Sequence, residues 1–287
     1  MLKRQLILLK LIESAGGSVS RLQLVKLSFL FAHEMKFEKF DSFYQFVPYK
    51  YGPFSFGLYH ELDSLIDQGL LSSENSYQLV LGQSNQTAKS RLEPALGRAA
   101  EYISWKYGSL SNEELIDVVY SRYPWFTINS DKKELRGANA PQVECAIFTA
   151  GYESLQVDGF LNMLLQAGVK KIIDVRRNPI SRNYGFHKST LSGLSKKLRI
   201  KYLHTPEAGI PSAWRTDLSS FSDYQRLFDR YEHEIIKPEM VSHIADLILE
   251  EPSVLICMEA DPNYCHRTRL AKHINNLTGL DIINLGE

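Results

Sequence analysis

The spacing of apolar residues in the first part of the chain predicts a mostly helical domain. Large apolar side chains recur every three or four positions around residues 6–12, 21–35 and 57–69, which is the spacing of amphipathic helices. Residues 72–82 alternate between polar and apolar side chains and predict a strand or a hairpin wing. Three helices followed by a wing are the order of a winged-helix module, which we predict for residues 1–85.

The next stretch is predicted to be helical before it becomes polar. Residues 87–131 continue the helical spacing, and Ser111 with Glu114 three positions later matches a capping box. The polar run 131–144 then predicts a linker. We therefore expect a helical bridge and linker over residues 86–140.

The pattern changes after Glu144, where short apolar runs alternate with amphipathic stretches of helical spacing. Such alternation predicts strands and helices that build a parallel α/β sheet. The predicted strands lie at residues 146–149, 169–175, 200–203, 253–259 and 281–285. The expected fold class is α/β, with a Rossmann-like parallel sheet domain over residues 141–287 preceded by the mostly helical winged-helix domain.

Composition places the chain among ordinary globular proteins. Hydrophobic residues make up 44%, and 33 lysines and arginines equal 33 acids, which excludes a uniformly basic surface and an acidic disordered tail. Three cysteines are too few for a disulfide framework and favour a reducing compartment. Apolar runs stay far below the ~20 residues of a membrane helix, and Lys10 and Glu13 interrupt the N-terminal one. We expect a cytoplasmic protein with no membrane partner.

Ligands of open parallel sheets bind beyond the carboxyl ends of the strands. Polar residues directly after the predicted strands are therefore the candidate site. Three such segments stand out, at residues 151–152, 174–182 and 257–267.

The last of these segments combines a carboxylate, a thiol, an imidazole and a guanidinium at the start of a predicted helix. Free backbone amides at that point attract an anion, and Arg267 would add a bidentate clamp. The same field would lower the pKa of Cys265 and favour its thiolate. The alternative is that the cysteine and the histidine are ordinary capping residues. The predicted catalytic residues are Asp174, Glu259, Cys265 and His266.

Basic side chains dominate the region that follows the second predicted strand. Residues 169–202 contain ten lysines and arginines and one acid, Asp174. A positive face of this kind suits the phosphates of a nucleotide or a nucleic acid. The alternative is a solvated loop whose charge is balanced by the acidic helices of residues 223–251. The predicted phosphate or nucleic-acid ligands are Tyr152, Arg176, Arg177, Arg182, His187, Lys188 and Arg267.

The sequence contains no familiar metal-binding or cofactor-binding motif. Cys257, Cys265 and His266 are candidate ligands, but their spacing matches no familiar structural zinc site and no second pair follows. No Walker A, G-x-G-x-x-G, zinc-deaminase or G-x-S-x-G motif occurs. We predict no metal and no cofactor.

Three segments identify a family. TAGYESLQVDGFLNMLLQAGVKKIIDVRRNPISR, FHKSTLSGLSKKLRIKYLHTPEAG and LICMEADPNYCHR resemble the bacterial family called domain of unknown function 488. Its pattern is a threonine-x-glycine opening, a D-V-R-x-x-P-x-S-R strand end, and a C-x-E loop that closes with C-H-R. The resemblance covers Ala146–Glu287. The family opening commonly reads G-H-S, whereas Gly151-Tyr152-Glu153 stands here, so no role of that histidine is carried over.

Two further resemblances bear on function. D-V-R after one strand and a cysteine loop before an arginine resemble rhodanese and phosphatase architecture, but Cys257 lies ten residues before Arg267 and Cys265 only two. Neither spacing matches those enzymes, so their chemistry is not predicted. The N-terminal half is similar to helix-turn-helix proteins found with toxin–antitoxin and phage-related genes, a resemblance that implies nucleic-acid binding.

Three classes of function stay open. The first is an enzyme that cleaves or modifies a base in DNA, in phage defence or repair, with a carboxylate assisting cleavage or Cys265 as nucleophile. Extruded bases would stack on aromatic side chains. The candidate platforms are Tyr152, Tyr184, Phe186 and Trp214.

The second class is a non-catalytic DNA-binding regulator whose α/β half binds a nucleotide or phosphate. The third is an interaction module whose aromatic surface, Phe37 to Phe56, packs on another chain. The expected partner is nucleic acid, DNA rather than RNA, and a homodimer is left open.

Overall fold

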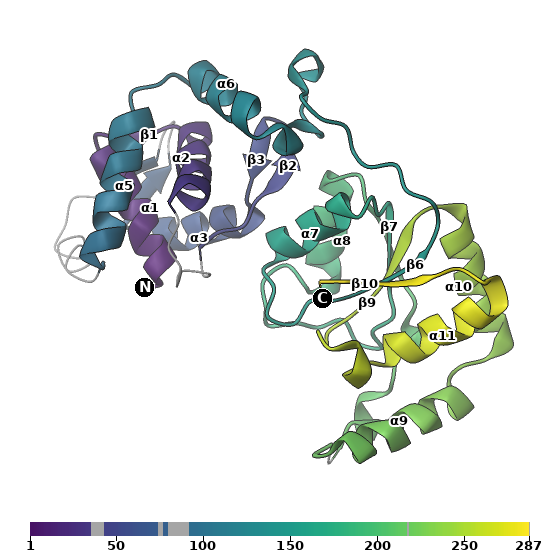
Figure 1. Cartoon of the computed structure of the whole chain (residues 1–287). Helices are drawn as coiled ribbons and strands as arrows, with labels where there is room; N and C mark the ends of the chain where they lie inside the picture. The colour runs from purple at the N-terminus through teal and green to yellow at the C-terminus, as the bar shows by residue number, and fades with distance from the viewer. Residues whose placement is uncertain (36–42, 74–76, 80–91, 217, 287) are drawn as a thin grey trace. The chain divides into compact units, whose positions relative to one another are not determined.

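The computed structural model describes residues 1–35, 43–73, 77–79, 92–216 and 218–286, and it separates into two compact units (Figure 1). The first unit is Met1–Asn139 and the second is Ala140–Glu287. The division falls within the polar run that was expected to be a linker. Among the helices in the described ranges, none is long and apolar enough to cross a membrane.

Helices packed around one apolar core form most of the first unit. They are α1 (Lys3–Ser14), α2 (Arg21–Glu34), α3 (Phe56–Asp67), α5 (Pro94–Tyr107) and α6 (Asn112–Arg122). Ser111 and Glu114 make the predicted capping box of α6. Ile103 of α5 and Val119 of α6 lie in the same core as α1 and α2. These two helices therefore belong to the first unit instead of bridging the two halves.

Short strands complete the first unit. β1 (Ser18–Val19), β4 (Leu71–Ser73) and β5 (Tyr77–Leu79) pair antiparallel in the order β1-β5-β4. Three helices followed by the β4–β5 hairpin agree with the order of elements that predicted a winged helix. Residues 74–76 and 80–82 of the predicted wing lie outside the described residues.

A second hairpin, β2 (Val47–Tyr49) with β3 (Gly52–Phe54), forms within the aromatic stretch, where no strand was predicted. Gly52 stands at φ +90°, a backbone conformation that favours glycine. The hairpin is tied to α2 by Lys26, whose buried ammonium donates to the carbonyl oxygens of Tyr51 and Pro53. A cation from the helix thus satisfies two carbonyl groups of the hairpin backbone.

The aromatic stretch expected to form a partner surface is largely core. Phe43, Tyr44, Phe46 and Phe56 are all buried, and Phe43 packs on a ring of α2. Burial of these large side chains contributes to the core of the first unit, so they are not an exposed interface. Phe37, at the start of the expected surface, lies outside the described residues.

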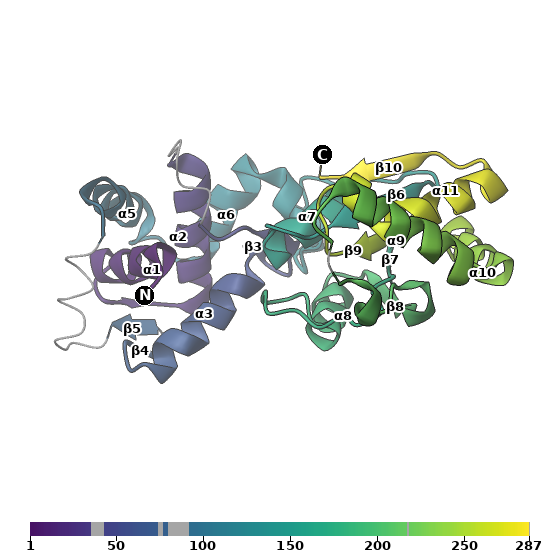
Figure 2. The ribbon, with the colours of Figure 1, turned by 90° about the horizontal axis from the view of Figure 1, so that it is seen from below.

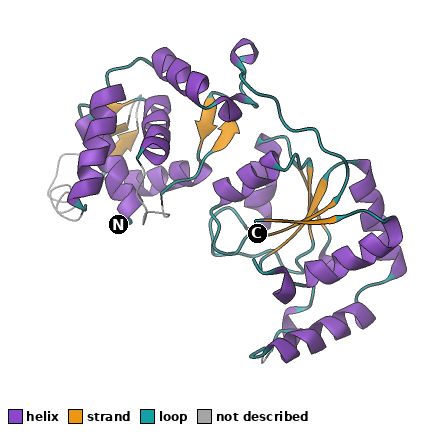
Figure 3. Ribbon diagram, in the orientation of Figure 1, coloured by secondary structure: helices purple, strands orange, loops and turns teal. Residues whose placement is uncertain are grey.

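The second unit is a five-stranded parallel sheet with helices on both faces (Figure 3). Its strands are β6 (Ile147–Gly151), β7 (Lys171–Asp174), β8 (Lys201–His204), β9 (Ser253–Cys257) and β10 (Ile282–Leu285). All neighbours pair in parallel in the order β10-β6-β9-β7-β8. The five predicted strands and the parallel α/β class are confirmed.

Two groups of helices cover this sheet. They are α7 (Val157–Gln166), α8 (Lys188–Lys197), α9 (Phe221–Glu234), α10 (Pro238–Glu250) and α11 (His266–Thr278). Apolar residues of α9, α10 and α11 pack with Ile147, Ile173 and Leu255 on one face of the sheet (Figure 2), and α7 lies on the other (Figure 1). The sequence analysis missed α8, although Leu191 and Leu194 have helical spacing and are buried.

Candidate functional site

Adjacent strands bring the three polar segments together at the carboxyl edge of the sheet. Gly151 lies opposite Cys257, and Asp174 lies opposite both Ile256 and His204. The backbone after β9 passes so close to Gly151 that a Cβ there would lie 1.9 Å from the Glu259 carbonyl oxygen. Glycine at this position therefore lets the Glu259 loop close over β6.

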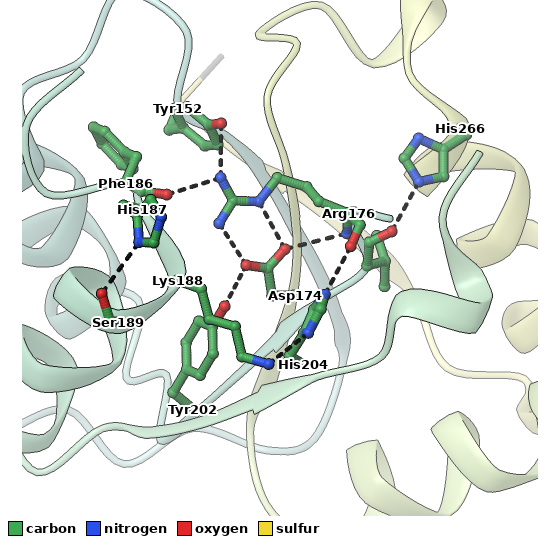
Figure 4. Close-up of polar contacts among 11 residues, drawn as sticks. Tyr152, Asp174, Arg176, Phe186, His187, Lys188, Ser189, Tyr202, His204 and His266 are labelled. Atoms are coloured by element: carbon green, nitrogen blue, oxygen red, sulfur yellow. Dashed lines mark hydrogen bonds and ion pairs between the residues drawn. The ribbon is translucent and has the colours of Figure 1, made fainter. Parts of the chain in front are cut away.

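A buried ion pair occupies the end of β7 (Figure 4). The guanidinium of Arg176 donates to both carboxylate oxygens of Asp174, through Nε to Oδ1 at 2.8 Å and through Nη2 to Oδ2. Oδ2 also accepts from the Tyr202 hydroxyl, and Oδ1 accepts from the Arg176 backbone amide at 3.1 Å. Asp174 is fully buried with both oxygens in use. Both oxygens of Asp174 therefore bind protein groups in this structure, and its predicted catalytic role stays a prediction.

The rest of the Arg176 guanidinium is engaged as well. Its Nη1 donates to the Tyr152 hydroxyl at 2.7 Å and to the Phe186 carbonyl oxygen at 2.9 Å. Burial lowers the pKa of Arg176, but hydrogen bonding and the charge of Asp174 outweigh burial and raise it. This buried arginine holds protein groups in this structure, and its predicted contact with phosphate stays a prediction.

The aromatic platforms expected for a base are also used internally. The rings of Tyr152 and Phe186 stack at a centroid distance of 4.2 Å and an interplanar angle of 10°, and both side chains are buried. One ring face of Trp214 is covered by the Arg230 guanidinium, 3.8 Å from the ring centroid. Tyr184 is half-buried. Tyr152 and Phe186 are thus core residues in this structure, and their predicted contact with nucleic acid stays a prediction.

Arg267 likewise closes the loop after β9. Its guanidinium donates to the carbonyl oxygens of Glu259 and Ala260 and, through Nε, to the Thr149 hydroxyl at 3.4 Å. The side chain is 1% exposed. Arg267, predicted to clamp an anion at the start of α11, binds backbone carbonyls in this structure, and its contact with phosphate stays a prediction.

Four side chains with soft or ionisable atoms meet directly beside this loop. The sulfur, nitrogen and oxygen atoms of Cys257, Glu259, Cys265 and His266 lie within 4.8 Å of one another. Both thiols donate to Glu259 Oε2, from Cys257 at 2.9 Å and from Cys265 at 3.1 Å. Cys257 Sγ lies 3.6 Å from His266 Nδ1. We call these four residues the Cys257 cluster.

The imidazole of the cluster has a fixed orientation. His266 Nε2 lies 3.2 Å from the Val175 carbonyl oxygen, and because a carbonyl only accepts, Nε2 carries a proton. Nδ1 then faces the Cys257 sulfur. Burial raises the pKa of Cys257, but the Cys265 thiol and the charge of His266 outweigh this effect and lower it; burial and the neighbouring Cys257 raise the pKa of Cys265. These shifts favour a thiolate at Cys257 over the one predicted at Cys265.

Glu259 is the cluster member that reaches solvent. Its side chain is 14% exposed, whereas Cys265 and His266 are each 1% exposed. Arg215 Nη1 donates to its Oε1 at 2.6 Å. Burial raises the pKa of Glu259, but the charge of Arg215 and the thiol hydrogen bond outweigh burial and lower it to about 2. Glu259 is therefore ionised at neutral pH. Arg215, which directly follows a short 3₁₀ turn, was not predicted from the sequence, because no motif marks it.

Several cations at the same edge remain exposed. Arg177, Arg182, His187 and Lys188 all reach solvent. Lys188 Nζ lies 2.9 Å from His204 Nδ1, and His204 Nε2 lies 2.9 Å from the Arg176 carbonyl oxygen (Figure 4). The carbonyl only accepts, so His204 is protonated on Nε2 and accepts from Lys188 on Nδ1. Sequence reasoning missed His204, whose position at the end of β8 was its available signal.

Comparison with known proteins agrees with the motifs. Residues 156–274, which lie in the second unit, match the family model described as Domain of unknown function DUF488. No curated protein and no solved structure matches the chain.

Proposed function

We propose that the chain is an enzyme that cleaves or modifies a base in DNA, in phage defence or repair; the family model that matches residues 156–274 is that of a domain of unknown function, so the proposal is drawn from the site. The observation that carries this proposal is Glu259, a partly exposed carboxylate held by Arg215 at the carboxyl edge of the sheet. The predicted winged-helix unit would bind the duplex.

Glu259 would act on the sugar–base bond. A carboxylate beside the anomeric carbon stabilises an oxocarbenium-like centre or takes a proton from an attacking water. The ion pair with Arg215 favours the charged form of the carboxylate, which is the form both roles require. Asp174 is fully buried, whereas the side chain of Glu259 is 14% exposed, so the proposal assigns this role to Glu259 alone.

The exposed basic side chains would bind the nucleic acid. Arg177, Arg182 and Lys188 reach solvent at the same edge of the sheet, where they would contact the phosphates that flank the target base. Extruding a base costs a few kcal/mol, which phosphate contacts of this kind help to offset. Binding that depends on them would weaken as salt rises.

A second function is favoured by a specific observation. Asp174, Arg176 and Arg267 all bind protein groups, so much of the polar edge serves the fold and not a substrate. This arrangement suits a DNA-binding regulator whose exposed cations bind a nucleotide or phosphate without chemistry.

The decisive experiment is mass spectrometry of released bases and of nucleosides after incubation with genomic and bacteriophage DNA. We expect a product with the wild type and a loss of rate of ~100-fold or more for Glu259→Gln, the scale of a lost acid–base group, with DNA binding retained. Glu207→Gln, an exposed carboxylate after β8, is the matched control and should keep its activity.

Three results would contradict the proposal. An active Glu259→Gln protein would remove that residue from the chemistry. Equal losses in both variants would point to general damage. Absence of any product from the wild type, together with a gel shift of DNA that changes when nucleotides are added, would replace the enzyme by the regulator.

A further inference from the structure

We propose that the Cys257 cluster binds one divalent metal ion of the zinc class, with Cys257, Cys265 and His266 as sulfur and nitrogen ligands and Glu259 as the oxygen ligand. This inference does not rest on the proposed function; the two share Glu259, which would be free to act on the sugar–base bond only in the metal-free chain. It also revises the expectation, drawn from cysteine spacing alone, that the chain holds no metal.

The separations between the donor atoms are close to those of a tetrahedral zinc site. Zn–S bonds of ~2.3 Å and Zn–N bonds of ~2.0–2.1 Å place tetrahedral ligand atoms roughly 3.5–3.8 Å apart. Cys257 Sγ and His266 Nδ1 are already separated by 3.6 Å. Glu259 Oε2 lies 2.9 Å and 3.1 Å from the two sulfurs, so binding requires this carboxylate to retreat by about 0.5 Å, a small side-chain movement.

The atoms around the cluster are those that orient metal ligands. His266 is fixed by the hydrogen bond from Nε2 to the Val175 carbonyl, the common arrangement in which a ligating histidine donates its other N–H to a backbone carbonyl. Glu259 Oε1 is held by Arg215, which leaves Oε2 facing the thiols. Both outer contacts keep the donor atoms pointing inward.

Proton and charge balance also favour a soft divalent cation. Both thiol hydrogens now point at one carboxylate oxygen, in the space between the four side chains. A metal ion would replace these two protons, form two metal–sulfur bonds and release two protons to solvent. Two thiolates and one carboxylate then carry three negative charges, of which the ion neutralises two and Arg215 faces the third. Thiolate and imidazole ligands select zinc or cobalt over magnesium or calcium.

The sequence spacing was misleading because the ligands come from one short loop. Cys257 ends β9, Cys265 caps α11 and His266 is the first residue of that helix. A short 3₁₀ turn, Pro262–Tyr264, folds the intervening chain back on itself. The two cysteines are thereby brought together without the two-residue spacing of familiar zinc motifs.

The test uses the full chain, purified under reducing conditions, incubated with excess Zn²⁺ and freed of unbound ion. Elemental analysis should give about one zinc per chain, and substitution with Co²⁺ should give the absorption of tetrahedral cobalt–thiolate. Cys265→Ser and Cys257→Ser should each lower retained metal at least tenfold. Cys145→Ser, which changes the third cysteine outside the cluster, should retain it fully.

Circular dichroism of each variant separates loss of folding from loss of the site. The variant Glu259→Gln gives a second check, because it keeps both thiols and should weaken metal retention less than either cysteine change. A folded wild type that retains no zinc or cobalt would overturn the proposal. Retention unchanged in the Cys257→Ser/Cys265→Ser double variant would also overturn it, as would a Cys257–Cys265 disulfide in place of bound metal. Metal bound at full stoichiometry in a protein that releases no base would leave this inference standing and remove only the proposed activity.

Discussion

Lys26 of the first unit and Arg176 of the second are both buried basic side chains, and they differ in what surrounds them. Arg176 faces the carboxylate of Asp174, and its pKa is raised although burial opposes this. Lys26 donates to two carbonyl oxygens, and burial lowers its pKa to about 7. The comparison teaches that the counter-ion, and not the number of hydrogen bonds, decides whether a buried group retains its charge.

The largest effect is expected when the counter-ion of Arg176 is removed. Asp174→Asn leaves the guanidinium buried with no opposite charge, which typically costs ~3–5 kcal/mol of unfolding free energy. Urea unfolding of the full chain, followed by circular dichroism, measures the loss. Asp229→Asn, at an exposed position on α9, is the control and should stay within ~0.5 kcal/mol of the wild type. Equal stability of the two variants would show that the pair contributes little.

The second prediction concerns pH and the lysine. Its pKa is about 7 in the folded chain and ~10.4 when unfolded, so between these values the unfolded state binds more protons. The free energy of unfolding therefore rises with pH across this window, by up to ~1.4 kcal/mol per pH unit, and this gain is lost as pH falls through 7.

Lys26→Met isolates this dependence. Urea midpoints of wild type and variant are measured at pH 7, 8 and 9 by tryptophan fluorescence. The midpoint of the wild type should rise more with pH than that of the variant. Groups common to both proteins cancel in the difference. Parallel pH profiles would mean that Lys26 keeps its charge when buried, and the contrast with Arg176 would disappear.

Much of the fold was accessible from the sequence. The strands of the second unit are short apolar runs with few polar interruptions, so their positions and parallel pairing followed from pattern alone. The carboxyl edge followed from the same pattern, because consecutive strands of such sheets end on one side. The hairpin β2–β3 was not predicted, because its residues carry strong turn signals and it is held by Lys26 from a distant helix.

The location of the candidate site could be predicted from the sequence, but the contacts of its side chains could not. Arg176 and Arg267 are of the residue type that commonly binds phosphate. Whether a guanidinium faces solvent or backbone carbonyls, however, depends on how separate segments pack. Arg215 and His204 were missed for the same reason, since each gains its partner only in the folded chain. The Cys257 cluster depends on a loop conformation that residue spacing does not encode.

The smallest effect is expected at the edge of the Asp174–Arg176 pair, where Tyr202 donates its hydroxyl to Asp174 Oδ2. Tyr202→Phe removes one hydrogen bond to a charged group and leaves the ion pair in place, so we expect a loss of ~1–2 kcal/mol, below that of Asp174→Asn. Tyr224→Phe on α9 is the control: it also removes a hydroxyl and keeps the ring, and it should change stability little. The same urea titration ranks the three proteins. A loss at Tyr202 as large as that at Asp174 would mean that the carboxylate depends on the hydroxyl as much as on the guanidinium, and that the counter-ion alone does not set the charge of the buried arginine.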